Sequence, residues 1–207
     1  TYNELETQLK KIEKLSDYVQ LDIMDDKFVD NISFNYNEDR YLSRYLDTLG
    51  VETKFELHLM VENPLDEIEK WKNVTNIFRI VFHIESDCDP TEVINKIKEY
   101  DWEIGIAINP ETKIEEIQEY LPEINVIQFM TVNPGKQGNP FLKSIGEKIK
   151  QITKLPNHPL VSVDGGINED NIELVKDWGV DIFNVGSALI KANDIKKEYN
   201  KLKSLIK

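Results

Sequence analysis

The chain has 207 residues and a formal net charge of −13, from 25 lysines and arginines against 38 aspartates and glutamates, with a pI near 4.7. This charge excludes a nucleic-acid partner, because no basic stripe is available to neutralise phosphates. The length suits one domain with a substantial core, so we predict a single domain over residues 1–207.

Cysteine content and hydropathy limit the compartment. The single cysteine, Cys88, cannot form an internal disulfide and suits a reducing environment. No apolar run approaches the roughly 20 residues that span a bilayer, and no signal peptide precedes the first predicted helix. The sequence therefore predicts a soluble, cytoplasmic protein without a membrane partner.

Segments with helical spacing alternate with short apolar runs typical of strands. In chain order the predicted elements are helix 2–15, strand 18–23, helix 38–49, strand 55–60, helix 64–71, strand 77–83, helix 90–100, strand 103–108, helix 113–121, strand 126–130, helix 141–153, strand 160–164, helix 171–178, strand 181–185 and helix 194–206. Three helix starts carry a cap residue before a proline, at Asn63-Pro64, Asp89-Pro90 and Asn139-Pro140. Such alternation predicts a parallel sheet.

The number of strands bears on the fold class. Eight helical segments accompany seven strand-like runs, and the chain opens on a helix and on Thr1 rather than methionine. We predict a (β/α)8 TIM barrel of parallel strands whose first strand is not evident in this sequence, because natural N-terminal residues are missing from it. The alternatives are a barrel closed differently and an open doubly wound sheet, which rarely uses so many consecutive short units.

Three predicted strands carry, at or near their carboxyl ends, side chains capable of acid–base chemistry: Asp22, His58 and Asp164. The carboxyl ends of the strands of a parallel barrel converge on one mouth, where chemistry is done. Residues two apart on a strand share a face, so Gln20 should lie beside Asp22. An unpaired buried carboxylate costs several kcal/mol, and a divalent metal held by Asp22, His58 and Asp164 would pair both acids. The alternative is that each acid forms an internal hydrogen bond or ion pair at the barrel rim.

Glycines follow the last two predicted strands, at Gly165-Gly166 and at Gly186-Ser187. In a barrel, glycines at these places let backbone N–H groups close on a phosphate beside a helix N-terminus. A third loop contains Gly135, Lys136, Gln137 and Gly138 and is long enough to fold over a ligand. Two adjacent glycines alone can also indicate only a tight turn.

These residues lie in motifs through which the chain resembles the ribulose-phosphate 3-epimerase family along nearly its whole length. The matching runs are Leu21-Asp22-Ile23-Met24-Asp25, Phe28-Val29-Asp30-Asn31-Ile32, His58-Leu59-Met60-Val61-Glu62-Asn63-Pro64, His83-Ile84-Glu85, Asn109-Pro110-Glu111-Thr112, Met130-Thr131-Val132-Asn133-Pro134-Gly135, Val163-Asp164-Gly165-Gly166-Ile167-Asn168 and Gly186-Ser187. Eight ordered matches make a chance resemblance implausible.

The resemblance implies an isomerase of carbohydrate metabolism, in the pentose phosphate pathway, that converts D-ribulose 5-phosphate to D-xylulose 5-phosphate. It implies that Asp22 and Asp164 exchange protons with C3 on opposite faces of an enediolate, and that a divalent metal polarises the C2 carbonyl. It also implies that backbone groups of Gly135, Lys136, Gln137, Gly138, Gly165, Gly166, Gly186 and Ser187 bind the phosphate. Met24, Met60 and Met130 match methionines that line the reacting centre, although methionines also fill core gaps.

The chain departs from the family pattern at its metal site and phosphate loop. Gln20 stands where the family has a metal-binding histidine, and a glutamine oxygen suits magnesium or manganese better than zinc or iron(II). Lys136 and Gln137 replace a phenylalanine and a glycine, and Lys136 either adds a charge to the phosphate site or is solvated. The family's substrate-binding serine on the first strand has no counterpart here.

These departures keep two alternatives open: an epimerase for another ketose phosphate such as allulose 6-phosphate, and a paralogue that binds a phosphosugar without catalysis. The pair His83 and Glu85 matches a family pattern, and we interpret it as a core histidine bonded to an acid. The expected partner is a small sugar phosphate, and the sequence is compatible with a homo-oligomer.

Overall fold

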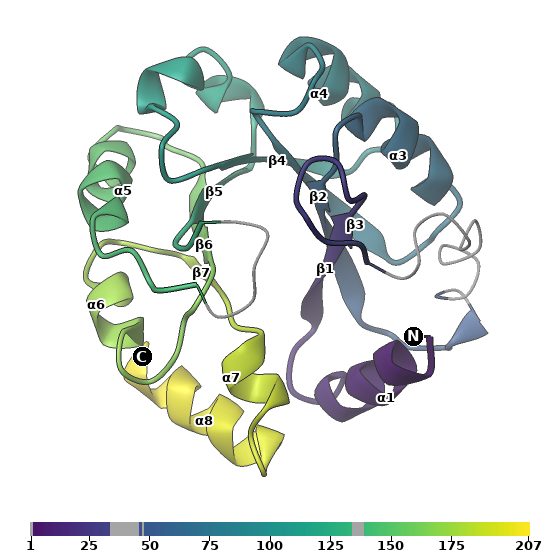
Figure 1. Cartoon of the computed structure of the whole chain (residues 1–207), viewed down its shortest axis with the longest axis vertical. Coiled ribbons are helices and arrows are strands. Elements are labelled where there is room, and N and C mark those ends of the chain that lie inside the picture. The colour runs from purple at the N-terminus through teal and green to yellow at the C-terminus, as the bar shows by residue number, and fades with distance from the viewer. Residues whose placement is uncertain (1, 34–45, 47, 134–138) are drawn as a thin grey trace. The chain divides into compact units, whose positions relative to one another are not determined.

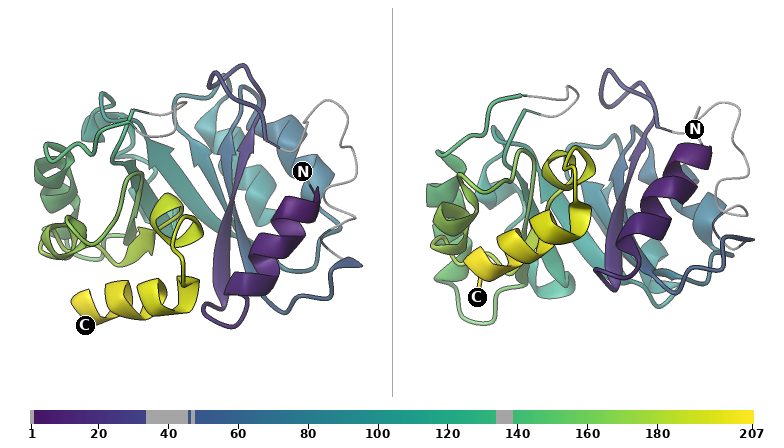
Figure 2. Two further views of the ribbon diagram at one scale, coloured as in Figure 1. Left: turned by 60° about the horizontal axis from the view of Figure 1, so that its bottom comes forward. Right: turned by 90° about the horizontal axis from the view of Figure 1, so that it is seen from below.

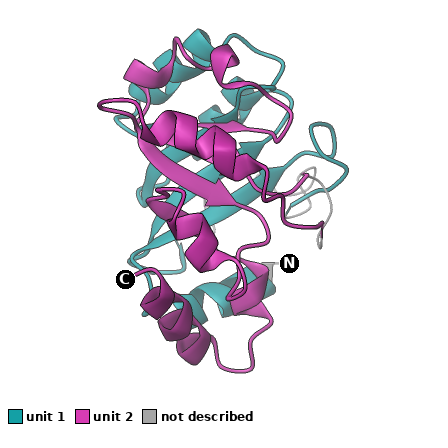
Figure 3. Ribbon diagram, turned by 90° about the vertical axis from the view of Figure 1, so that its left-hand side faces the viewer, with its two compact units in different colours: residues 1–105 teal, residues 106–207 magenta. Residues whose placement is uncertain are grey.

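The computed structural model describes residues 2–33, 46, 48–133 and 139–207. The chain divides into two compact units, residues 1–105 and 106–207 (Figure 3). The first contains α1 Tyr2–Ile12, β1 Tyr18–Met24, β2 Lys54–Met60, α3 Pro64–Trp71, β3 Ile77–His83 and α4 Pro90–Lys98. Strand β4, Glu103–Ile108, spans the boundary. The second contains the 3-10 turns η1 Ile114–Glu116 and η2 Leu121–Glu123, then β5 Val126–Met130, α5 Ile145–Thr153, β6 Leu160–Asp164, α6 Ile172–Lys176, β7 Ile182–Asn184, α7 Ser187–Ile190 and α8 Ile195–Leu205.

The strands follow one another in the sheet in chain order from β1 to β7, as labelled in Figure 1. The pairings β1–β2, β2–β3, β5–β6 and β6–β7 are all parallel. Parallel strands in chain order, joined through helical segments, have the topology of an α/β barrel, whereas a doubly wound sheet reverses its strand order. The predicted fold class is therefore confirmed, with seven strands among the described residues and a helix before the first. The single-domain organisation over residues 1–207 stays a prediction.

Most predicted elements form where the sequence placed them. The strands at Ile77–His83, Glu103–Ile108, Val126–Met130 and Leu160–Asp164 keep their predicted bounds, and the other three differ at their ends. The caps of α3 and α4 form as predicted, because Asn63 accepts the N–H groups of Leu65 and Asp66, and Asp89 accepts that of Thr91. The predicted helix 38–49 lies largely outside the described residues.

Two helix predictions are wrong in part. The segment 113–121 forms only the turns η1 and η2, because among its apolar side chains Ile117 alone is buried, while Pro122 disfavours helical backbone at Leu121. The Asn139-Pro140 pair does not start α5, which begins at Ile145 after Ser144. The short helix α7 was not predicted, since four residues show no helical period.

Strand β2 is the most buried element of the first unit, with every residue after Lys54 inaccessible to solvent or nearly so. Helix α1 runs alongside β1 and buries Leu5 and Leu9 (Figure 2). Between β2 and β3 the register shifts by one residue after the pair Phe55–Ile77, so that Glu56 pairs with Arg79 rather than with Phe78. Paired residues project to the same face of a parallel sheet, so this one-residue shift decides which face the side chains of β3 occupy.

The shift brings a buried arginine against two carboxylates. Arg79 donates from Nη1 to Glu56 at 2.6 Å, and from Nε and Nη2 to Glu103 at 2.9 and 2.5 Å. Arg79 and Glu56 are both buried, whereas the Glu103 side chain is 46% exposed. A buried charge needs such a partner, and Arg79 provides one for the Glu56 carboxylate.

The loop after β1 is fixed by the carboxylate of Asp25. Its Oδ1 accepts the backbone N–H groups of Lys27 and Phe28, both at 3.0 Å, and its Oδ2 accepts that of Glu62 at 2.8 Å. Partial burial raises the pKa of this carboxyl, but the donated hydrogen bonds lower it more, so that the pKa lies below its usual value. Asp25 thereby ties the loop after β1 to the end of β2.

We expect Asp25→Asn to lower the free energy of unfolding near neutral pH by about 1 kcal/mol, because a neutral amide accepts these hydrogen bonds more weakly. The folded-state pKa of Asp25 lies below that of the unfolded chain, so its contribution is complete above about pH 4 and is lost as the pH falls through the folded-state pKa. Urea unfolding between about pH 3 and pH 7 should therefore show a shallower acid loss in Asp25→Asn than in wild type. The control is Asp30→Asn, at an exposed position of the same loop, and an equal effect of the two substitutions would contradict the prediction.

Candidate active site

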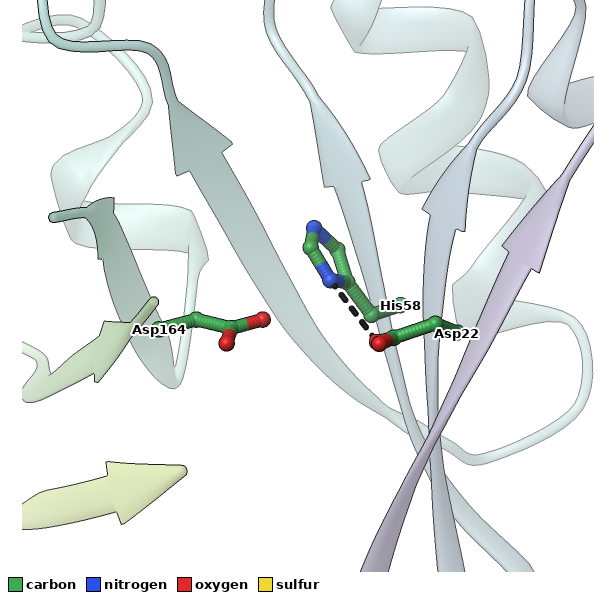
Figure 4. Close-up of side chains that lie close together, drawn as sticks. All are labelled: Asp22, His58 and Asp164. Carbon is green, nitrogen blue, oxygen red and sulfur yellow. Dashed lines mark hydrogen bonds and ion pairs between the residues drawn. The ribbon is translucent and has the colours of Figure 1, made fainter. Parts of the chain in front are cut away.

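Asp22 and His58 form one cluster in the first unit. They are register partners on β1 and β2, and His58 Nδ1 lies 3.2 Å from Asp22 Oδ1, the contact drawn as a dashed line in Figure 4. Gln20 lies on the same face, as predicted, with Nε2 2.8 Å from Asp22 Oδ1 and 3.4 Å from His58 Nδ1. His58 is fully buried and the Asp22 side chain is 46% exposed. A buried imidazole nitrogen thus faces a carboxylate that solvent can reach.

The donor set suits a divalent cation. A carboxylate oxygen and an imidazole nitrogen are ligands used by zinc, iron(II) and manganese, and an amide oxygen is tolerated by harder cations. Asp22, His58 and Asp164 each offer such a donor atom. Within the first unit, Asp22 and His58 could therefore contribute to a metal site, with Gln20 beside both.

Asp164 ends β6 in the second unit (Figure 4). Its Oδ2 lies 3.5 Å from Nε2 of the fully buried Gln128, on the neighbouring strand β5. The Gln128 oxygen accepts from Ser162 at 3.3 Å and from Asn184 at 3.1 Å. This polar network, not predicted from the sequence, orients the amide of Gln128 toward Asp164. The available signal was that Gln128 and Ser162 lie two residues before Met130 and Asp164, on the same strand face.

The two glycine loops of the second unit begin at one level of the sheet, because Asp164 and Asn184 are register partners. Gly165 and Gly166 have φ angles of 118° and 68°, a region that favours glycine. A Cβ on Gly165 would lie 2.6 Å from Cγ2 of Val132, so a side chain there is excluded on packing grounds as well. Gly186 precedes α7, whose first N–H groups have no partner within the helix.

Hydrogen bonds hold the first of these loops in shape. Thr131 Oγ1 donates to the carbonyls of Asp164 and Gly165 at 3.0 and 2.5 Å, and Asn171 Nδ2 donates to that of Gly166 at 2.9 Å. These bonds engage the carbonyls of Asp164, Gly165 and Gly166 and fix the conformation of the turn. The third predicted loop, with Gly135, Lys136, Gln137 and Gly138, lies outside the described residues.

The three methionines occupy the last positions of their strands. Met24 ends β1 and is the register partner of Met60, which ends β2, whereas Met130 ends β5 and pairs with Asp164. Met60 and Met130 are buried, and Met24 is half-buried. Met24 and Met60 thus lie two residues after Asp22 and His58, on the same strand faces, and Met130 lies one strand away from Asp164.

The solved structures show that this architecture is a known one. The structure is similar to that of KGPDC from Streptococcus mutans, with a TM-score of 0.75 at 14% identity, over 99% of this chain and 92% of that one. Together with the strand order, this likeness defines the fold of the protein as a parallel α/β barrel.

The sequence comparisons define the family. The model of the ribulose-phosphate 3 epimerase family matches residues 1–190. Ribulose-phosphate 3-epimerase of Chlamydia pneumoniae is 33% identical over 201 residues, which cover 94% of this chain and 85% of that protein. Its counterpart in Aquifex aeolicus is 32% identical over 195 residues, covering 92% and 85%.

The chain belongs to the ribulose-phosphate 3 epimerase family. The predicted resemblance and the predicted class of enzyme, an isomerase, are both confirmed, and the family implies a sugar phosphate as substrate. Among the described residues, every helix is too short or too polar to cross a bilayer.

Proposed function

We propose that this chain interconverts D-ribulose 5-phosphate and D-xylulose 5-phosphate by inverting C3 through an enediolate. The observation that carries the proposal is the Asp22–His58 pair at adjacent strand ends, in a chain whose relatives at about a third identity are ribulose-phosphate 3-epimerases. Strand ends on one rim of a parallel barrel are where such enzymes bring their reacting groups together.

Asp22 and Asp164 are the two acid–base groups in this scheme. Inversion through a planar intermediate requires that one carboxylate remove the proton from one face and that another acid return a proton to the opposite face. The solvent exposure of Asp22 and its contact with His58 support its assignment as one acid–base group. The contact of Asp164 with Gln128 supports its assignment as the other. The thioethers of Met24, Met60 and Met130 would line the reacting centre.

A divalent metal would be held by Asp22, His58 and Asp164. When bound, it supplies positive charge for the oxygen that becomes negative as C3 loses its proton. The donor set admits zinc, iron(II), manganese and magnesium, and Gln20, a weak ligand at most, favours manganese or magnesium.

The phosphate would be bound by backbone N–H groups of Gly165, Gly166, Gly186 and Ser187. Two observations support this assignment. The two loops follow the register partners Asp164 and Asn184, and the position of Gly165 has no room for a side chain. The phosphate contacts predicted for Gly135, Lys136, Gln137 and Gly138 lie outside the described residues and stay predictions.

The test is an assay of purified protein with D-ribulose 5-phosphate and allulose 6-phosphate, each with Mn²⁺, Mg²⁺, Zn²⁺ or Fe²⁺. We expect epimerisation and solvent deuterium at C3 with the pentulose phosphate. Preferential turnover of the hexulose phosphate would identify the related epimerase instead. Binding of both without exchange, with every metal, would identify a non-catalytic phosphosugar-binding protein, an alternative that Gln20 and Lys136 keep open.

We expect Gln20→His to raise the affinity for Zn²⁺ by about tenfold or more, because an imidazole would replace an amide beside His58 and Asp22. Isothermal titration of the apoprotein with Zn²⁺ measures this directly. Gln151→His, at an exposed position of α5, adds the same ligand away from the site and serves as the control. Equal affinities for wild type and Gln20→His would place Gln20 outside the metal site.

A further inference from the structure

A line of hydrogen bonds runs through the first unit from the metal-site cluster to a partly exposed carboxylate. His58 Nε2 lies 3.0 Å from His83 Nε2, and His83 Nδ1 lies 3.0 Å from Glu85 Oε2. Both imidazoles are fully buried and the Glu85 side chain is 24% exposed. The other nitrogen of His58, Nδ1, is the one that faces Asp22 and Gln20. His83 therefore contacts the His58 imidazole at the nitrogen that faces away from Asp22, and Glu85 contacts His83.

The two rings meet through their nitrogen atoms. Their centres lie 5.1 Å apart with an interplanar angle of 25°, although the facing nitrogens are only 3.0 Å apart. Rings stacked face to face would not bring two nitrogens so much closer than their centres. A contact of 3.0 Å between ring nitrogens requires a single proton between them, because two lone pairs or two N–H groups would repel.

A carboxylate stands at each end of the line, Glu85 beside His83 and Asp22 beside His58. Glu85 fixes the direction, because it is the closer and less exposed of the two, whereas Asp22 is 46% exposed and accepts from Gln20 Nε2 at 2.8 Å. An ionised Glu85 can only accept, so His83 Nδ1 carries a proton and donates it. In a neutral His83 the Nε2 atom is then the acceptor, and His58 Nε2 must be the donor. A neutral His58 is left with an unprotonated Nδ1. Gln20 Nε2, with two N–H groups, lies 3.4 Å from this nitrogen and 2.8 Å from Asp22 Oδ1, so the amide faces both acceptors in the metal-free protein.

We propose that His83 and Glu85 are positioning residues, which hold the His58 proton on Nε2 and so present Nδ1 as a ready ligand for a divalent cation. An outer carboxylate that fixes the tautomer of a ligating histidine is a common arrangement, and here a second histidine lies between the two. The metal-affinity part of the proposal rests on the proposed function of the site, whereas the tautomer part concerns the metal-free protein alone.

The loop after β1 holds this line in place. The ring of Phe28 packs on that of His83 with centres 4.7 Å apart at 47°, and the N–H of Phe28 is one of those bound by Asp25. The His83 ring is thus held by the hydrogen bond to Glu85 at one edge and by an aromatic contact on its side. A buried ring with such contacts has little freedom to rotate, so the hydrogen bonds from His58 through His83 to Glu85 keep their direction.

The test begins with the nitrogen NMR spectrum of metal-free protein labelled with ¹⁵N-histidine. The chain has three histidines, so His58 and His83 are assigned by single substitutions, and His158, which contacts the Pro159 carbonyl, is the internal reference. We expect the shift of an unprotonated nitrogen at His58 Nδ1 and those of protonated nitrogens at His58 Nε2 and His83 Nδ1. A proton on His58 Nδ1 would overturn the proposal, whatever the protein catalyses.

The second measurement is the affinity for Mn²⁺ alone, by titration of the apoprotein. We expect His83→Phe, which keeps a ring but removes the acceptor, to weaken Mn²⁺ binding by about 10- to 100-fold. Glu85→Met should weaken it in the same direction, and Glu85→Gln, whose oxygen can still accept from His83 Nδ1, should restore most of the loss. Thermal unfolding shows which variants fold, and unchanged Mn²⁺ affinity in folded Glu85→Met would overturn the positioning role.

The two measurements separate this proposal from the proposed function. A protein with the expected tautomer and Mn²⁺ response but no epimerase activity would refute the function and leave the positioning role intact. An active epimerase whose His58 carries its proton on Nδ1 would support the proposed function and refute the positioning role.

Discussion

Asp22→Asn and Asp164→Asn should each slow the interconversion of ribulose 5-phosphate and xylulose 5-phosphate by about 100- to 10,000-fold, the range for loss of a general acid–base group. An amide is close to a carboxylate in size but cannot take up a proton at neutral pH. Both positions lie at strand ends with exposed or half-buried side chains, so the thermal midpoint should change little. Coupled assays in both directions measure the rate.

Exchange of deuterium from solvent distinguishes the two acids. If each serves one face of C3, a variant that lacks one carboxylate still deprotonates the epimer whose proton faces the other. Asp22→Asn and Asp164→Asn should therefore retain exchange without inversion on opposite epimers, as measured by NMR on each substrate alone. Metal content is measured in parallel, because both carboxylates are proposed ligands.

The matched control is Asp177→Asn, an exposed carboxylate after α6, which should leave every rate unchanged. Wild-type interconversion in either Asp22→Asn or Asp164→Asn would refute the two-acid scheme. Exchange surviving on the same epimer in both metal-loaded variants would refute the assignment of one acid to each face.

Arg79→Met should lower the free energy of unfolding by about 3–5 kcal/mol, because it leaves the buried Glu56 carboxylate without its cation. The flexible methionine fills much of the volume of the arginine stem, so packing loss is a minor part of this effect. The contact with Glu103 adds little, since that side chain is 46% exposed. Equilibrium urea unfolding at neutral pH measures the change.

The double variant Glu56→Gln with Arg79→Met tests the physical cause. Removing both charges removes the uncompensated carboxylate, so most of the lost stability should return. Arg79→Lys keeps the charge but not the planar guanidinium that donates to both Glu56 and Glu103. Its free energy of unfolding should lie between those of wild type and Arg79→Met. A double variant as unstable as Arg79→Met would show that packing, not charge, dominates at this position.

The strands, the fold class and the Asp22–Gln20 contact could be predicted from the sequence, because side-chain alternation along one strand is a local property. The resemblance to the family added the expectation that Asp22, His58 and Asp164, which lie on different strands, belong to one site. Local sequence patterns carry no such information. The short helix α7 and the turns at η1 and η2 could not be predicted, because tertiary packing rather than periodicity decides whether so short a segment is helical.

The contact between Glu85 and the buried His83 was predicted from the sequence. The contacts of His83 with His58 and of Gln128 with Asp164 could not be predicted, for a different reason. Each contact depends on which residue of the neighbouring strand is the register partner, and the sequence of one strand alone does not determine the register. His83 lies two residues beyond Val81, the register partner of His58, and so shares its face. In an unshifted register Ile80 would oppose His58, and His83 would project to the other side of the sheet.

The one-residue shift at Phe55–Glu56 therefore has a consequence for how this protein can evolve. The same register of β3 brings Arg79 against Glu56 and His83 against His58. One structural irregularity therefore governs both a buried ion pair and the imidazole of the proposed metal site. A single-residue insertion or deletion ahead of Arg79 would reverse both together. The loops around this strand can change in length during evolution. A change in the length of β3 itself would affect both the stability of the fold and the proposed metal site.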